Sequence, residues 1–496
     1  MKSRYKMLVC WTAATCLLAA CSTDESGPEA QGPDVVNCEV DVQADQAVEV
    51  AFDPTSVPEA ADLFPLGVQA GAMTSDRVVV WSVASDGAPK TLRVWREGTE
   101  PGRVALVEDR QVEGTEGYLK VAVEGLSPRT TYWYAYFEGS EGAWTGRSRV
   151  GRFVTAFPDG CLAPLTIGGT HGTKYTRSPF TALDITAEYE PDVYVHLGDI
   201  SYNDKAAKVG TPAAYRGEWR KTFEVPGFQE INAATGQYVV WDDHEVVDNS
   251  SLYDLEESVT EVGKQSFFEH TPMERLDNGS YWRSYRWGRT AEFFALDCRH
   301  ERDQESAFTD DATYIGEDQM EWLKKGLLES PSFFKVILNS VPISQYPPLV
   351  AFQEDRWQGF ERQREEILSF IEEHAIERVV WLTGDFHLGT VNRIEREGPR
   401  SRMWEIMMGP GGNKDNPMWN LVQMCVLDRE DVAPADQFPF FGGQYMATFV
   451  ELNPVRDTVR VQFVDADTRE LLYDATMKAG GDFSSAPLPG EVTCEP

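Results

Sequence analysis

The sequence predicts a layered α/β domain preceded by an all-β sandwich. The chain has 496 residues, too many for one compact core, because domains mostly have about 100–200 residues. Short β-rich runs separated by Gly, Pro and Asp occupy residues 45–157, whereas apolar runs alternate with amphipathic helices from about residue 164 onward. Hydrophobic residues make up 42% and charged residues 25% of the chain, which excludes a disordered or collagen-like protein.

Residues 1–20 are predicted to be a lipoprotein signal peptide. Basic residues precede a short apolar run from Met7 to Ala20, and Leu18-Ala19-Ala20-Cys21 resembles a bacterial lipoprotein box. Cleavage before Cys21 and lipidation of its thiol would tether the protein to a bacterial membrane. The alternative is an ordinary cleaved signal peptide that leaves a soluble protein. Ser22 follows the cysteine, which by resemblance to other lipoproteins favours the outer membrane. We therefore expect a lipid-anchored protein of the cell envelope, in the outer membrane or the periplasm.

Residues 21–44 are predicted to be a flexible tether, because most of this stretch is small, polar and rich in Pro and Gly. Residues 45–157 then contain short strands spaced as in a sandwich. The segment from Gly125 to Tyr134 resembles the tyrosine corner of fibronectin type III domains. We expect a fibronectin III or Ig-like sandwich here, a fold that by itself says little about function. The strand candidates are Val78–Ser82, Thr91–Trp95, Leu119–Val123 and Thr131–Phe137.

Residues 158–478 are predicted to form the α/β domain, followed by a Gly-, Ser- and Pro-rich tail at 479–496. Apolar residues at helical spacing mark two amphipathic helices in it, and a buried strand follows the second. The helix faces are Met320, Leu323 and Leu327, and Ile367, Leu368 and Ile371; the further strand candidates are Arg378–Leu382, Tyr445–Leu452 and Thr458–Val464.

Polar side chains follow several apolar runs of this domain at the point where each strand ends. Sites in sheets flanked by helices form beyond the carboxyl ends of the strands, so we expect these side chains to meet in one crevice. A single Asp after a strand is more often a helix cap. The prediction therefore depends on several polar side chains following strands in the same domain. They are Asp199 and Tyr202 after Val193–Leu197, Asp243 and His244 after Tyr238–Trp241, Asp297 and Arg299 after Glu292–Leu296, Asn339 after Lys335–Leu338, and Asp385 and His387 after Val379–Leu382.

Such a cluster of carboxylates indicates a site for several metal ions, because carboxylates without cations between them repel one another. Metal ions held there would polarise a phosphoryl oxygen and generate hydroxide from water, and a guanidinium matches the geometry of phosphate oxygens. The chain carries 45 basic and 80 acidic residues, a formal charge of −35. We therefore expect no binding of nucleic-acid duplexes, whereas bound cations would still permit phosphate chemistry.

At these residues the chain resembles the alkaline phosphatase D family of calcineurin-like metallophosphoesterases, from about residue 64 to 390. The motifs that carry the resemblance are Gly67-Val68-Gln69-Ala70-Gly71, Gly198-Asp199-x-x-Tyr202, Trp241-Asp242-Asp243-His244-Glu245, Leu296-Asp297-x-Arg299 and Gly384-Asp385-x-His387. The resemblance implies a metallophosphoesterase core, a layered β-sandwich with flanking helices, for residues 158–478. It also implies a phosphate-ester substrate.

The resemblance implies iron and calcium as cofactors. Asp199 would bridge the metals, and Tyr202 would be a phenolate ligand of ferric iron. Asp243 and Asp385 would hold calcium at the second position, and His387 would complete the set. A packed tyrosine of the core is the alternative for Tyr202.

The resemblance also implies two catalytic residues. His244 would donate a hydrogen bond or a proton to the departing oxygen, and Arg299 would hold the phosphoryl group. A packed, hydrogen-bonded histidine is the alternative for His244.

One family feature is missing. The family places a cysteine metal ligand just after the first strand of this domain, but here Leu165–Gly169 runs into Thr170 and His171, and Cys161 lies before the strand. His171 is the candidate substitute, and a change from thiolate to imidazole would raise the iron potential or favour another metal such as zinc or manganese. A weakened first site is the alternative.

Cysteine pairing stays open, because the five cysteines after Cys21 are an odd set that can pair in many ways; a bridge between Cys38 and Cys494, near the two ends, is a guess. The leading functional hypothesis is a surface-tethered phosphoesterase that uses metal-bound hydroxide. The alternative is a non-catalytic envelope lipoprotein of the same fold that binds a partner or acts as a scaffold. The substrate, the choice between monoesters and diesters, and the oligomeric state stay open.

Overall fold

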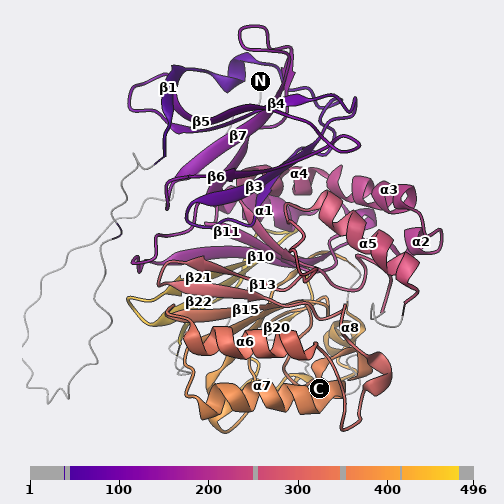
Figure 1. Cartoon of the computed structure of the whole chain (residues 1–496). Helices are drawn as coiled ribbons and strands as arrows, with labels where there is room; N and C mark the ends of the chain where they lie inside the picture. The colour runs from indigo at the N-terminus through magenta and orange to yellow at the C-terminus, as the bar shows by residue number, and fades with distance from the viewer. Residues whose placement is uncertain (1–37, 39–44, 250–254, 347–352, 414–415, 480–496) are drawn as a thin grey trace, which may run out of the picture.

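The computed structural model describes residue 38 and residues 45–249, 255–346, 353–413 and 416–479. The N-terminal strands lie at one end of the molecule and helices α6 and α7 at the other (Figure 1). None of the helices in these ranges is both long and apolar enough to cross a membrane. The predicted signal peptide, the C-terminal tail after residue 479 and most of the predicted tether lie outside the described residues.

The N-terminal module contains the predicted strands, but they belong to two different sheets. One sheet belongs to the N-terminal module alone and has the order β1-β5-β4-β7-β8, and β9 also pairs with β7. Its strands are β1 Val48–Ala51, β4 Lys90–Glu97, β5 Arg103–Val112, β7 Thr131–Glu138, β8 Gly146–Arg147 and β9 Gly151–Val154. The amide of Ser127 donates to the Tyr132 hydroxyl at 2.8 Å, a contact of the kind expected of a tyrosine corner.

The other predicted N-terminal strands extend a large sheet of the second domain. Its order is β23-β22-β21-β10-β11-β12-β2-β3-β6, with β19 also paired to β10. The strands are β2 Val68–Gly71, β3 Arg77–Val83, β6 Tyr118–Glu124, β10 Leu165–Thr173, β11 Val193–Leu197, β12 Gln237–Val240, β19 Pro410–Gly412, β21 Met446–Asn453, β22 Thr458–Asp465 and β23 Leu471–Lys478.

The two domains meet within this sheet at Gly71, which pairs with Gln237 of β12. A β-carbon at Gly71 would lie 2.6 Å from Pro272 Cγ and 2.9 Å from the Gln237 carbonyl oxygen, so glycine permits the close approach. Gln237 Nε2 donates to Gln69 Oε1 at 3.0 Å. A sandwich separate from the α/β domain was expected; instead, three of its strands continue the sheet of that domain.

The large sheet, called the first sheet below, is faced by a second sheet of the α/β domain, which completes the core. The second sheet has the order β13-β14-β15-β16-β18-β17-β20. The strands are β13 Arg283–Trp287, β14 Ala291–Ala295, β15 Phe334–Asn339, β16 Val379–Thr383, β17 Gly389–Arg393, β18 Trp404–Met407 and β20 Phe440–Gly442. Val195 and Leu197 of the first sheet share one apolar cluster with Val336 and Leu338 of the second, so the main core lies between the sheets.

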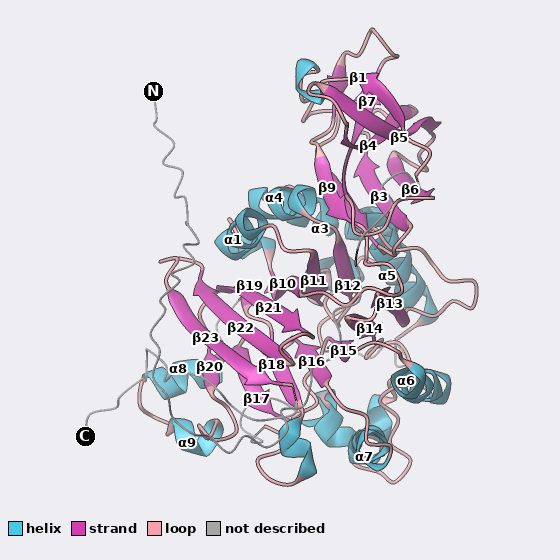
Figure 2. Cartoon of the chain, turned by 90° about the vertical axis from the view of Figure 1, so that its left-hand side faces the viewer, coloured by secondary structure: helices cyan, strands magenta, loops and turns pink. Residues whose placement is uncertain are grey.

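Helices cover the outer faces of both sheets (Figure 2). The predicted apolar stripes of α6 and α7 are buried against Ile337 and Trp381 of the second sheet, and Trp219 of α3 and Phe267 of α5 pack beside Tyr194 of the first. The layered α/β arrangement is thus confirmed. The helices are α1 Thr181–Tyr189, α2 Asp204–Ala207, α3 Pro212–Phe223, α4 Pro226–Ala234, α5 Glu257–His270, α6 Glu317–Glu329, α7 Glu361–Glu373, α8 Pro417–Gln423 and α9 Arg429–Val432.

Cys38 forms a disulfide with Cys161. The guess of a bridge between Cys38 and Cys494 is therefore wrong, since nearness to the chain ends does not determine which thiols meet in the fold. Cys425 is also disulfide-bonded, and Cys298 is a buried free thiol. The Cys161 thiol is thus committed to a disulfide and does not replace the family's metal ligand.

Candidate metal centre

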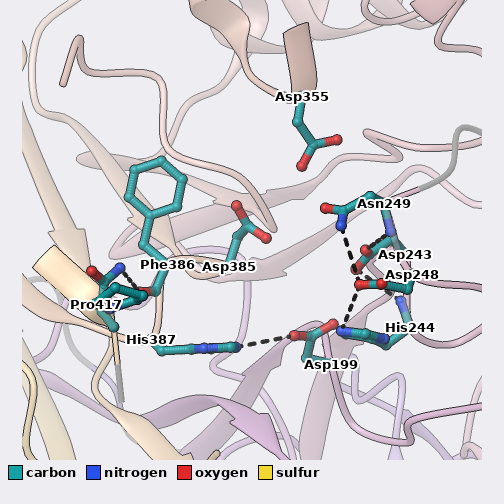
Figure 3. Close-up of a pocket in the computed structure, with 11 residues that line it drawn as sticks. Asp199, Asp243, His244, Asp248, Asn249, Asp355, Asp385, Phe386, His387 and Pro417 are labelled. Carbon is teal, nitrogen blue, oxygen red and sulfur yellow. Dashed lines mark hydrogen bonds and ion pairs between the residues drawn. The ribbon is translucent and has the colours of Figure 1, made fainter. Parts of the chain in front are cut away.

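The strand ends bring the predicted carboxylates together, as Figure 3 shows. Asp199 follows β11, Asp243 follows β12 and Asp385 follows β16. The chain turns sharply at these points: φ is +59° at Asp199, +70° at Asp385 and +53° at His387. Non-glycine residues rarely adopt this left-handed conformation, and such residues cluster at functional sites.

Asp199 lies at the centre of the group and is 2% exposed. Its Oδ2 accepts a hydrogen bond from the Tyr202 hydroxyl at 2.7 Å and lies 3.6 Å from His387 Nε2. Its Oδ1 is buried and has no hydrogen-bond partner among the described residues. A buried carboxylate oxygen without a partner is costly unless a cation binds it.

Two overlapping sets of side chains have ligand atoms that all lie within 4.8 Å of one another. The sets are Asp199, Asp243 and His244, and Asp242, Asp243 and Asp385. Carboxylate oxygens and imidazole nitrogens are the ligands that iron, calcium, zinc and manganese accept. The donor set and the unpartnered Asp199 oxygen together fit the metal ions that the resemblance implies.

Glu245 holds the loop that carries Asp199, a role that the sequence did not reveal. Its buried carboxylate accepts the backbone amides of Asp199, Ile200 and Ser201 at 3.1, 2.5 and 3.1 Å. It also accepts the amide of Asp242 at 2.7 Å. One carboxylate thus joins the loop after β11 to the loop after β12 and fixes the spacing of their side chains.

Arg299 is fully buried among the carboxylates. Its Nε donates to Asp242 at 2.5 Å and its Nη1 to Asp355 at 2.7 Å, while Nη2 lies 3.7 Å from Asp385. Burial alone would lower the pKa of Arg299, but the Asp242 and Asp355 carboxylates raise it above its usual value. The guanidinium therefore stays charged and neutralises part of the acidic cluster.

His244 lies at the edge of the centre, with its side chain 14% exposed. Its Nδ1 is 2.7 Å from Asp204 Oδ1, and its ring lies over that of Tyr202 with the centroids 4.0 Å apart. Burial lowers the pKa of His244, but the carboxylates of Asp243 and Asp199 outweigh that effect and raise it well above the usual value. The imidazole can therefore hold a proton.

His171 lies behind His387 rather than among the carboxylates. It is fully buried, and its Nε2 accepts the backbone amide of His387 at 3.0 Å. The lone pair of that nitrogen is therefore directed at an amide. His171 stands apart from the two sets of candidate ligands that the structure brings together.

Asn413 contacts two of the candidate ligands. Its side-chain amide donates to the Tyr202 hydroxyl and lies 2.5 Å from His387 Nε2. It follows β19, a strand of three residues with no apolar run, so strand-end reasoning missed it. Asp355 was missed for a related reason, because it comes from the short 3₁₀ turn Gln353–Asp355 rather than from a strand end.

A cavity of about 230 Å³ opens over the centre. The aromatic ring of Phe386 lies on one side of it, beside Pro417 (Figure 3). The lining residues are Asp199, Asp243, His244, Asp248, Asn249, Asp355, Asp385, Phe386, His387, Asn416 and Pro417. Arg299 is not part of this lining, because the carboxylates separate it from the cavity.

Comparisons with known proteins agree with the geometry of the site. Residues 167–435 match the family described as PhoD-like phosphatase, and residues 28–157 match its N-terminal domain. Alkaline phosphatase D of Bacillus subtilis (strain 168) is 26% identical over 411 residues, which cover 69% of this chain and 68% of that protein.

Two solved structures share the fold. The structure of PhoD superposes with a TM-score of 0.73 at 20% identity and covers 86% of this chain and 93% of its own. Purple acid phosphatase PPD1 from yellow lupin (Lupinus luteus) superposes with a TM-score of 0.58 at 13% identity, covering 82% of this chain and 72% of its own.

Proposed function

Because this chain belongs to the PhoD-like phosphatase family, a family of metal-dependent phosphoester hydrolases, we propose that the centre around Asp199 is its active site. The observation that carries the proposal is the buried Asp199 oxygen without a partner among the described residues, on a side chain grouped with the Asp243 carboxylate and the His244 imidazole. A purely structural aspartate would hydrogen-bond both oxygens.

We propose that Asp199, Tyr202 and His387 hold a first metal ion and that Asp199, Asp243 and Asp385 hold a second. By family resemblance these metals are iron and calcium, with zinc or manganese as substitutes. When bound, the metals would polarise the phosphoryl group and activate water as hydroxide for in-line attack.

His244 is proposed to protonate the departing oxygen. Asp204 accepts from Nδ1 and so fixes the tautomer and orientation of the ring. When the ring is protonated at both nitrogens, Nε2 is then the nitrogen that can give a proton to the leaving group. The nearness of His244 to the cavity supports this role.

Arg299 was predicted to hold the phosphoryl group. Its contacts support a different proposal: Nε and Nη1 hold Asp242 and Asp355, and Nη2 faces Asp243 and Asp385 at 3.9 and 3.7 Å. Arg299 would then act on the phosphoryl group through the charge and position of these carboxylates.

We also propose that lipidated Cys21 tethers the enzyme to the bacterial cell envelope, at the outer membrane or within the periplasm. Cys21 lies outside the described residues, and the proposal is supported by the lipoprotein box in the sequence. A tethered enzyme would act on phosphate esters outside the cytoplasm.

Metal analysis combined with kinetics tests the proposed function. The purified protein is expected to contain two metal ions per chain and to hydrolyse p-nitrophenyl phosphate, bis(p-nitrophenyl) phosphate or both, with activity lost on chelation and restored by metal. A visible absorption band would identify tyrosinate bound to ferric iron. A colourless, active enzyme with only divalent metals would contradict the iron assignment. A protein that binds metal but hydrolyses neither ester would support the non-catalytic alternative.

A further inference from the structure

At the position of the family's cysteine, Thr170 Oγ1 and His171 Nε2 both contact other groups of the protein. Thr170 Oγ1 lies 2.6 Å from the hydroxyl of Tyr194, inside the core. The Nε2 of His171 accepts the amide of His387. The position that a thiolate would fill therefore needs a donor from elsewhere in the chain.

The pairing of β19 with β10 places Asn413 near the first metal position. β19 pairs in parallel with β10, and His171 lies opposite Pro410 and Thr173 opposite Gly412. Asn413 is the next residue and is 2% exposed. Gly172 lies close to both Asn413 and His387: a β-carbon there would be 3.6 Å from Asn413 Cβ and 3.2 Å from His387 Cδ2. The strand pairing thus places Asn413 beside His387.

Four donor side chains converge around one point. The Tyr202 oxygen lies 2.7 Å from Asp199 Oδ2 and 3.4 Å from His387 Nε2, and His387 Nε2 lies 3.6 Å from Asp199 Oδ2. The Asn413 amide contacts both Tyr202 and His387. Ligands about 2.1 Å from a metal ion lie roughly 3.0–3.4 Å from one another, close to the separations between the Tyr202, His387 and Asp199 atoms.

In the structure, Asn413 faces His387 with its amide nitrogen, Nδ2, so ligation of a metal requires the amide to rotate. The oxygen and nitrogen of an asparagine amide have nearly the same shape, and rotation of the amide exchanges them. With Oδ1 turned inward, Asn413 presents an oxygen lone pair beside the Tyr202, His387 and Asp199 donors. An amide NH₂ in the same place would offer a metal ion no lone pair.

We propose that Asn413 is a ligand of the first metal position through Oδ1 and takes the place of the family's cysteine. The inference rests on the proposed metal centre. It replaces an anionic, soft donor by a neutral, hard one, and a harder donor set favours harder cations over thiolate-preferring ones. The first position of this chain is accordingly expected to bind its metal less tightly than a site with a thiolate.

Metal binding of two variants of the full chain tests this assignment. Asn413→Leu is expected to lose one metal equivalent, or to release that metal at a chelator concentration at least about tenfold lower than the wild type, as loss of a metal-supporting residue usually does. Asn413→Asp keeps an oxygen in place and adds charge, so it should retain both metals and resist the chelator more strongly than the wild type. Elemental analysis and a chelator titration measure both effects without reference to turnover.

Two controls separate the assignment from neighbouring explanations. Asn420→Leu changes an asparagine of α8 that is outside the cavity lining and should leave metal content unchanged. His171→Ala should keep both metals but release the first at a lower chelator concentration than the wild type, since its Nε2 holds the backbone of the proposed ligand His387. Wild-type metal retention in Asn413→Leu, or loss of the metal only in His171→Ala, would overturn the proposal. If Asn413→Leu does not fold, the assignment is overturned when Asn413→Asp releases its metals at the same chelator concentration as the wild type.

Failure of the Asn413 assignment can be distinguished from failure of the proposed phosphoesterase function. A wild-type protein that binds two metals yet hydrolyses no phosphate ester would leave the ligand assignment intact and remove the phosphoesterase proposal. If the wild type hydrolyses phosphate esters and Asn413→Leu keeps its full metal content, the ligand assignment falls and the phosphoesterase proposal stands.

Discussion

Asp199, Asp385 and His387 share a left-handed backbone conformation that costs a non-glycine residue roughly 1–3 kcal/mol. The surrounding structure must supply this energy. Glu245 does so at Asp199 by accepting four backbone amides of the two loops, and His171 contributes at His387 by accepting its amide. The candidate ligands are thus held in position by neighbours whose own role is positional.

Replacing Asp199 by Asn should abolish phosphoesterase activity while the domain stays folded. The change removes charge from the side chain that would contact both metal positions but keeps its shape. A loss of several orders of magnitude in kcat is expected, because metal activation of water supplies a large part of such a rate enhancement. Steady-state kinetics and circular dichroism measure the two properties. Retention of more than about a tenth of wild-type turnover would show that Asp199 does not bridge the metals.

Strand-end reasoning located the residues of the centre that follow long apolar runs. Asp199, Asp243, His244 and Asp385 come together as that reasoning requires. It could not locate Asp355 or Asn413, since a 3₁₀ turn and a three-residue strand leave no periodic pattern. Nor could it show that Arg299 is buried behind the carboxylates, because burial depends on packing between distant segments.

At the scale of elements, the join between β2 and β12 depends on one small residue. Gly71→Ala would place a methyl group 2.6 Å from Pro272 Cγ and 2.9 Å from the Gln237 carbonyl oxygen. Overpacking of this kind costs about 1–3 kcal/mol, so the variant should unfold at a lower temperature. Gly217→Ala in α3 is the matched control: a β-carbon there meets nothing within 4 Å, and alanine favours a helix. Equal melting temperatures for Gly71→Ala and the wild type would show that this join tolerates a side chain.

His270 makes the same junction sensitive to acid. Its ring is fully buried, its Nδ1 lies 2.7 Å from the Ser266 carbonyl oxygen and its Nε2 2.9 Å from the Tyr118 hydroxyl of β6. Burial lowers the pKa of His270 from 6.5 to about 4. The unfolded chain therefore binds a proton that the folded protein excludes, and stability is complete above pH 6.5 and falls as the pH drops towards 4.

Protonation of His270 is expected to lower the free energy of unfolding by roughly 3 kcal/mol between pH 6.5 and pH 4. His196, whose pKa burial lowers to about 3, adds to the loss in the same direction. Denaturant unfolding at several pH values measures it. His270→Gln should flatten the dependence, whereas His374→Gln, at an exposed helix end, should not. An equally steep dependence in His270→Gln would assign the acid sensitivity to other groups.

Element prediction succeeded where periodicity was strong, as for α6 and α7, whose apolar stripes are buried as expected. β23 was not predicted, although Leu471–Lys478 carries the alternation of apolar and polar residues that marks a half-buried strand. The shared sheet was beyond sequence reasoning: only one residue pair, Gly71 and Gln237, joins β2 to β12.

At the scale of the whole molecule, Cys21→Ala should release the protein from the membrane fraction or leave its signal peptide uncleaved. Lipidation at this cysteine would bury several acyl chains, which anchor far more firmly than one. Fractionation and mass spectrometry of the mature N-terminus measure the outcome. Membrane association that is unchanged in the variant, with no lipid found on the wild-type N-terminus, would exclude the lipoprotein anchor.

The disulfide between Cys38 and Cys161 has a mechanical consequence for a tethered enzyme. Cys38 is the first residue that the structure describes, and Cys161 lies just ahead of β10 in the α/β domain. Tension on the N-terminal segment would pass through this covalent bond straight into the α/β domain and bypass the 122 residues between the two cysteines. The N-terminal strands would carry no load, and shear at the cell surface would leave the join at Gly71 undisturbed. Reduction of the disulfide would reroute the force through β1 and its neighbours.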